Sequence, residues 1–225
     1  MKENMTNGYS IAERTPPLKE EIKALEGIPT SILSDSLGRY LVAKQILPIN
    51  KKPIQICANA FTVEVRSGDN LMIHKALQMI MPGDALVISG DGEIDRALFG
   101  EILMTIAKKR GAIAAVVDGA VRDVDAFDRE SFPCWARGIS LRGPFKDGPG
   151  TINQPIYIGG MLVNPGDIIV GDIDGVIAIP RHLAKEAILL GKEKQQQEES
   201  TIAAILNGSY DDSWVDKVLK QKNAL

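Results

Sequence analysis

The pattern of apolar and polar positions changes character three times along the chain of 225 residues. Residues 17–47 have the apolar spacing of helices, interrupted by a Gly-Ile-Pro break, after which Thr30 is a suitable helix N-cap. Between about residues 54 and 180, short apolar runs typical of strands alternate with helical segments. From about residue 181 onward the pattern is helical and polar. We therefore predict an α/β fold with N-terminal helices and a helical C-terminal tail.

Several elements of the central region can be placed individually. ICANAFTVEV (56–65) alternates like a strand, NLMIHKALQMI (70–80) has helical spacing, and DALVIS (84–89) is a short apolar run after a Pro-Gly turn. Further on, Asp174-Gly175 separates two apolar runs, as in a tight hairpin turn. A calcium loop at that turn is excluded because the remaining oxygen ligands are missing.

The segment GEILMTIAKKRGAIAAVVDGAVRD (100–123) is the most informative. It predicts a helix that ends at Gly111 after a basic last turn, and then a buried strand that breaks at Asp118-Gly119. The strand would return close to the start of the helix, where α/β proteins tend to bind ligands. Gly100 has two interpretations. It allows close packing, or the helix begins there and offers free N–H groups to an anion.

Two opposite charges, Arg122 and Asp123, follow the predicted strand directly. They could cancel as a local ion pair. They could also face one small molecule, with the guanidinium holding an anion and the carboxylate a metal. With Glu101 at the start of the preceding helix, one guanidinium and two carboxylates are expected near one another.

Composition narrows the functional classes. The formal charge of −3 and a pI near 5.5 give no basic footprint for nucleic acid, and no apolar stretch is long enough to span a membrane. Cys57 and Cys134 are isolated, so we interpret them as buried thiols of a cytoplasmic protein. His74 is interpreted as structural, and Asp118 as a residue that shapes the turn before Gly119. Asp69 either caps a helix or lies at the mouth of a ligand pocket.

The run from Gly100 to Asp123, with GE followed by RGAIAAVVDGAVRD, resembles the family that joins the regulator of ribonuclease activity A to the 4-hydroxy-4-methyl-2-oxoglutarate aldolases. The similarity includes PTSILSDSLG near the start, NLMIHKAL with the following PGDALVI, and GDIDGVIAIP before the final helices. The resemblance implies a swivelling β/β/α fold. It implies a single aldolase-like domain over residues 1–225, with a core at about 54–180. The tail at about 181–225 would make the contacts of a homotrimer or a dimer of trimers.

The resemblance also implies a site. In the enzymes of this family a divalent metal, Mg²⁺ or Mn²⁺, binds the pyruvate part of a small 2-keto acid substrate. Carried over by position, Arg122 would contact pyruvate and Asp123 would ligate the metal. The substrate-binding turn would consist of Gly100, Glu101, Ile102 and Leu103.

Two glutamates complete the implied set of catalytic residues beside Arg122. The active enzymes typically have an aspartate twenty-one positions before the arginine, whereas this chain has Glu101, which is one methylene longer. A further glutamate comes from the C-terminal helix of a neighbouring subunit in such enzymes. We assign that role to Glu199, with Glu198 beside it as the alternative.

These residue types suit the implied reaction. Cleavage of a C–C bond next to a 2-keto acid leaves the enolate of pyruvate, which a hard cation and a fixed guanidinium can stabilise. Decarboxylation of oxaloacetate passes through the same enolate, so one site can carry out both reactions. The resemblance thus predicts a class II pyruvate aldolase that acts on 4-hydroxy-2-keto acids and decarboxylates oxaloacetate.

A second functional class remains open. Some proteins of this family inhibit an RNA-degrading endonuclease by binding it, which requires a surface and not a pocket. The long tail NGSYDDSWVDKVLKQKNAL and the acidic residue at position 101 both favour the enzyme, because the compact regulators are shorter.

Overall fold

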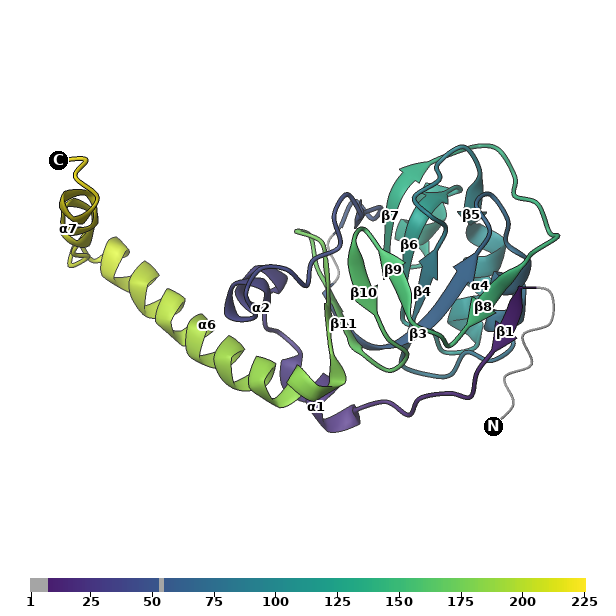
Figure 1. Cartoon of the computed structure of the whole chain (residues 1–225), viewed down its shortest axis with the longest axis horizontal. Coiled ribbons are helices and arrows are strands. Elements are labelled where there is room, and N and C mark those ends of the chain that lie inside the picture. Colours follow the sequence, from purple (N-terminus) through teal and green to yellow (C-terminus); the bar gives the residue numbers. More distant parts are fainter. Residues whose placement is uncertain (1–7, 53–54) are drawn as a thin grey trace.

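A mainly parallel sheet lies at the centre of the computed structural model, which describes residues 8–52 and 55–225 (Figure 1). Residue 54, the expected start of the core, lies outside the described residues. The parallel strands are β3 (Ile56–Val65), β4 (Asp84–Ser89), β6 (Ala114–Val121) and β7 (Cys134–Ile139), with β5 (Ala97–Phe99) parallel to the end of β6. The expected strands at 56–65 and 84–89 are thus confirmed.

Shorter strands extend this sheet. Antiparallel partners of β3 are β8 (Gly150–Ile152) and β11 (Ile168–Gly171), and β11 forms a hairpin with β12 (Val176–Ile179). The edges are β1 (Tyr9–Ile11) beside β8 and β2 (Leu47–Pro48) beside β7. A separate hairpin consists of β9 (Ile156–Ile158) and β10 (Met161–Val163). The hairpin expected at Asp174-Gly175 is the β11–β12 hairpin.

Helices pack on two sides of this core. On one side lie α3 (Leu71–Leu77), α4 (Glu101–Lys109) and α5 (Val124–Arg129). On the other lie α1 (Lys19–Leu25), α2 (Thr30–Ser36), the 3₁₀ turn η1 (Arg181–Leu183) and α6 (Ala184–Leu206), which leads to α7 (Trp214–Gln221). The expected α/β fold with N-terminal helices and a helical tail is confirmed.

The parallel strands are apolar on both faces because each face is covered. In β4, Leu86 and Ile88 pack toward α3 and α4, whereas Ala85 and Val87 belong to the cluster that includes the β9–β10 hairpin. A third cluster joins the β11–β12 hairpin to α1, α2 and α6. The two cysteines are buried as expected, and burial raises the pKa of the Cys57 thiol to about 12.

The N-terminal helices are shorter than expected from the pattern over 17–47. Residues 37–47 are not helical, and Thr30 is the first residue of α2 and not its N-cap. The cap comes from the β11–β12 turn, where Asp172 accepts hydrogen bonds from the Thr30 backbone N–H at 2.8 Å and from its hydroxyl at 2.6 Å. A cap supplied from 142 residues away leaves no local pattern in the sequence.

The last helices leave the body of the molecule. The first turns of α6 pack against the body through the buried residues Ala184, Ala187 and Gly191. A Cβ added at Gly191 would lie 3.1 Å from the Leu33 side chain. Beyond this point α6 extends away from the sheet toward α7, as Figure 1 shows. Among the described residues, no helix is both long and apolar enough to cross a membrane.

Candidate active site

The start of α4 lies against the end of β6. The helix begins at Glu101, and Gly100 precedes it in an extended conformation. A Cβ added at Gly100 would lie 2.7 Å from Asp123 Oδ2 and 2.9 Å from Arg122 Cγ. The close packing expected at this glycine is confirmed, because the absent side chain lets Arg122 and Asp123 approach the backbone. The helix also begins after Gly100, whereas anion binding by its N–H groups stays a prediction.

Asp123 is held by the backbone that it approaches. Its Oδ2 accepts a hydrogen bond from the Glu101 N–H at 3.1 Å, at the positive end of the α4 dipole. Asp123 also has a left-handed backbone conformation, with φ of 56°, at the point where β6 turns into α5. This conformation is uncommon for a residue other than glycine and directs the chain from the strand into the helix.

Arg122 and Asp123 form only a loose pair. Arg122 Nε lies 3.6 Å from Asp123 Oδ2, and both side chains are partly exposed, so the contact contributes less than about 1 kcal/mol. Both residues line the same cavity. The local ion pair is therefore present but loose. The binding of one small molecule by both side chains stays a prediction, with which their shared cavity is compatible.

The Glu101 carboxylate has a partner that the sequence did not indicate. Arg129, on α5, forms an ion pair with Glu101 and a second one with Asp125 at 3.3 Å. The backbone of Glu101 therefore contacts Asp123 while its side chain contacts Arg129. The pairing joins residues 28 positions apart, which is why no local spacing revealed it.

The cavity beside these residues is small, about 140 Å³. Pockets for drug-sized molecules have about 300–1,000 Å³, so this one suits a small metabolite. Of the residues implied by the resemblance, Gly100, Ile102, Leu103, Arg122 and Asp123 line it. The other lining residues are Asn70, His74, Ala97, Leu98, Phe99, Pro144 and Lys146.

Three polar residues of this wall were not predicted as part of the site. Lys146 adds a second cation beside Arg122. His74 was interpreted as structural but lies on the wall. Burial lowers its pKa, and the nearby charge of Lys146 lowers it further. Asn70 is buried. Asp69 is buried beside it and accepts the Leu71 N–H at the start of α3, although the N-cap position itself is Asn70.

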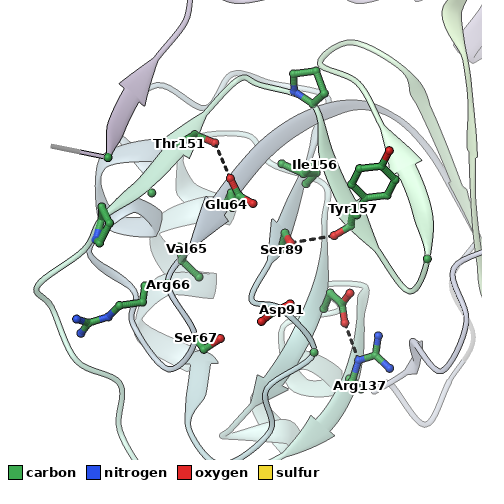
Figure 2. A pocket seen from close by; sticks show the side chains of 17 residues that line it. Glu64, Val65, Arg66, Ser67, Ser89, Asp91, Arg137, Thr151, Ile156 and Tyr157 are labelled. Atoms are coloured by element: carbon green, nitrogen blue, oxygen red, sulfur yellow. Dashed lines mark hydrogen bonds and ion pairs between the residues drawn. The ribbon is translucent and has the colours of Figure 1, made fainter. Parts of the chain in front are cut away.

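A larger cavity, about 1010 Å³, opens near the ends of β3 and β4 (Figure 2). Its wall includes the ion pair between Arg137 Nε and Asp118 Oδ1, at 2.6 Å. Asp118 was expected in a turn, but β6 continues through it to Val121, because Arg137 and the Gly159 N–H satisfy its buried carboxylate. Neither Arg122 nor Asp123 lines this cavity, so the candidate site is the smaller one.

Glu199 does not lie in the candidate site of its own chain. It is exposed on the far half of α6, which points away from the body (Figure 1). Neither Glu199 nor the side chain of Glu198 lines the cavity, and Glu198 pairs with Lys194 at 3.3 Å on the same helix. A contribution of Glu199 to this site therefore requires a second copy of the chain.

The oxygen donors at the cavity suit a hard divalent cation. Asp123 makes both of its contacts through Oδ2, and among the described residues none involves Oδ1. Mg²⁺ is commonly held by one or two carboxylates while substrate and water supply the other oxygens. In the described part of the chain, no cluster of three or more His, Cys, Asp or Glu residues could enclose a metal.

Comparison with known proteins agrees with this fold. Residues 30–178 match the model of the RraA-like family, described as Aldolase/RraA. A relative from Halalkalibacterium halodurans, provisionally named 4-hydroxy-4-methyl-2-oxoglutarate aldolase, is 41% identical over 179 residues, which are 79% of this chain and 85% of the relative.

Solved structures show the same fold. An uncharacterized protein from Pseudomonas syringae is 26% identical, with a TM-score of 0.77, and the match covers 87% of this chain and 96% of that one. Streptomyces coelicolor RraAS2, an unusual member of the RNase ES inhibitor RraA family, is 25% identical, with a TM-score of 0.73 and coverage of 84% and 97%. The fold and the site define an α/β protein of the swivelling type. This chain belongs to the RraA-like family.

Proposed function

We propose that this protein is a divalent-metal-dependent pyruvate aldolase that cleaves 4-hydroxy-2-keto acids of the 4-hydroxy-4-methyl-2-oxoglutarate type and decarboxylates oxaloacetate. The observation that carries the proposal is the shared cavity of Arg122 and Asp123 at the start of α4. The provisional name of the 41% identical relative supports the same activity.

Several residues of the cavity would have a role in this reaction. Arg122 would bind the keto oxygen of the pyruvate part, where negative charge develops as the C–C bond breaks. The free backbone N–H groups of Ile102 and Leu103 would bind the carboxylate, because the first turn of a helix attracts anions. Lys146 extends the positive charge along the wall, which suits a substrate with a second carboxylate.

Asp123 would hold Mg²⁺ or Mn²⁺ through its uncommitted Oδ1. When bound, such a cation supplies positive charge that stabilises the enolate left by C–C cleavage. Glu101, and Glu199 of a neighbouring subunit, would orient the water that carries protons to and from the substrate. In this structure the Glu101 side chain pairs with Arg129 and does not line the cavity.

This assignment predicts that the purified protein releases pyruvate from oxaloacetate and from 4-hydroxy-4-methyl-2-oxoglutarate. EDTA should abolish turnover, and added Mg²⁺ or Mn²⁺ should restore it, because the cation carries much of the charge stabilisation. Pyruvate release can be followed with a coupled lactate dehydrogenase assay. Turnover that survives exhaustive chelation would contradict the proposal.

The alternative function, regulation of an RNA-degrading endonuclease by binding, requires a surface and not a cavity. The two classes differ in the same assay, because a regulator would release no pyruvate from either acid. The structure favours the enzyme through one observation: Gly100 allows Arg122 and Asp123 to approach one small cavity.

A further inference from the structure

Glu101 contacts both ends of α5. Its backbone N–H donates to Asp123 Oδ2 at 3.1 Å, directly before the first residue of this helix. Its carboxylate forms an ion pair with Arg129, the last residue of the helix. Gly100 and Ile102, on either side of Glu101, line the small cavity, whereas Glu101 does not. The carboxylate that the proposed reaction would use is therefore held outside the cavity, beside Arg129.

The ion pair between Glu101 and Arg129 can be exchanged at low cost. The two side chains are 47% and 51% exposed, so water screens their attraction. Arg129 also pairs with Asp125 at 3.3 Å, four residues earlier on α5. Arg129 therefore keeps a carboxylate partner when Glu101 leaves it.

A cation bound by Asp123 would lie within reach of the Glu101 carboxylate. The Glu101 N–H bonds to Asp123 Oδ2, and a Cβ added at the preceding Gly100 would lie 2.7 Å from the same oxygen. The backbone of Glu101 is thus in direct contact with the Asp123 carboxylate. A doubly charged cation attracts a carboxylate more strongly than one exposed guanidinium does. We therefore expect a cation at Asp123 to compete with Arg129 for Glu101.

We propose that Arg129 is a positioning residue that holds Glu101 outside the cavity until a divalent cation binds at Asp123, and that Glu101 then exchanges Arg129 for the cation. The inference rests on the proposed metal-dependent function. It adds that the affinity for the cation is set by a competition within the chain, in which Arg129 opposes binding and Glu101 supports it.

The test measures Mn²⁺ binding in Arg129→Met, which keeps a long unbranched side chain and removes the charge. Electron paramagnetic resonance of free Mn²⁺ gives the Kd without substrate or turnover. We expect Arg129→Met to have a Kd about threefold lower than that of wild type, on the scale of one exposed ion pair. Glu101→Gln should raise the Kd about twofold or more. In the Glu101→Gln background, Arg129→Met should have no further effect, because the two residues act as one pair.

Three results would overturn the inference. The first is an unchanged or higher Kd in Arg129→Met. The second is an equal decrease when Arg129→Met is made in the Glu101→Gln background, which would show that Glu101 takes no part. The third is an unchanged Kd in Glu101→Gln, which keeps the inference testable if Arg129→Met does not fold. The absence of Mn²⁺ binding by wild type would instead refute the proposed metal-dependent function.

Lys108→Met is the matched control. Lys108 pairs with Glu130 at 3.1 Å, a contact that also joins α4 to the end of α5, and the two side chains are 46% and 43% exposed. This substitution removes the same charge from the same pair of helices but leaves Glu101 and Arg129 in place. At physiological ionic strength its Kd should stay within about 1.5-fold of wild type. A decrease as large as that of Arg129→Met would show a general effect of charge and would contradict the proposed competition. The melting temperature of each variant checks its folding.

Discussion

Replacing Arg122 with lysine is expected to lower kcat about 100-fold or more while leaving the fold and the assembly unchanged. Lysine keeps the charge but loses the planar fork of five donors. The expected loss is on the scale of removing one donor to a developing oxyanion. Arg122 contributes little to stability, because its ion pair with Asp123 is 3.6 Å long and partly exposed. Steady-state kinetics with oxaloacetate, together with the melting temperature, measures both effects.

The matched control is Arg110→Lys, at the exposed C-terminal end of α4. That substitution makes the same chemical change on the same helix–strand unit but away from the cavity, so kcat should stay within about twofold of wild type. If Arg122→Lys also turns over like wild type, the arginine is structural and the candidate site is misplaced.

The second large effect concerns the sharing of the site between subunits. We expect Glu199→Ala and Arg122→Ala each to be inactive alone, and mixed oligomers of the two to recover part of the activity. Recovery follows because some interfaces would pair an intact Arg122 with an intact Glu199. Pyruvate release after subunit exchange is the measurement.

Exposed apolar side chains support this arrangement. Ile202 and Ile205, on the far half of α6, are 55% and 54% exposed, and Ile102, at the edge of the cavity, is 70% exposed. Covering both surfaces in one contact would bring α6 of one chain to the cavity of another.

Glu198→Ala is the matched control for the mixing experiment, because Glu198 already pairs with Lys194 on its own helix. It should retain activity without mixing. The absence of recovery, despite demonstrated subunit exchange and an inactive Glu199→Ala parent, would mean that the glutamate does not act across an interface.

The sequence predicted those parts of the fold that depend on local patterns. The strand at 56–65, the helix that begins after Gly100 and the hairpin at Asp174-Gly175 follow from apolar periodicity and turn composition, and all three are present. Boundaries set by distant contacts were not predicted. β6 continues through Asp118 because Arg137, 19 residues away, neutralises the carboxylate inside the sheet.

The candidate site, too, was predicted only where its residues lie close together in the sequence. Gly100, Arg122 and Asp123 belong to one contiguous motif, so the resemblance was enough to group them, and the structure places all three on one cavity. Asn70, directly before α3, also lines this wall, and no spacing in the sequence relates it to Arg122. Arg129 was missed for a similar reason, because its ion pair with Glu101 depends on how α4 and α5 pack.

The central claim is that a cation stabilises the enolate of pyruvate. Its most direct test is proton exchange at the methyl group of pyruvate. The protein is incubated with pyruvate in D₂O, and the loss of the methyl proton signal is followed by nuclear magnetic resonance. We expect rapid exchange with Mg²⁺, none above background with EDTA, and a loss of about 100-fold or more in Arg122→Lys. Exchange that is indifferent to chelation, or an enzyme that releases pyruvate without ever exchanging its methyl protons, would contradict the account.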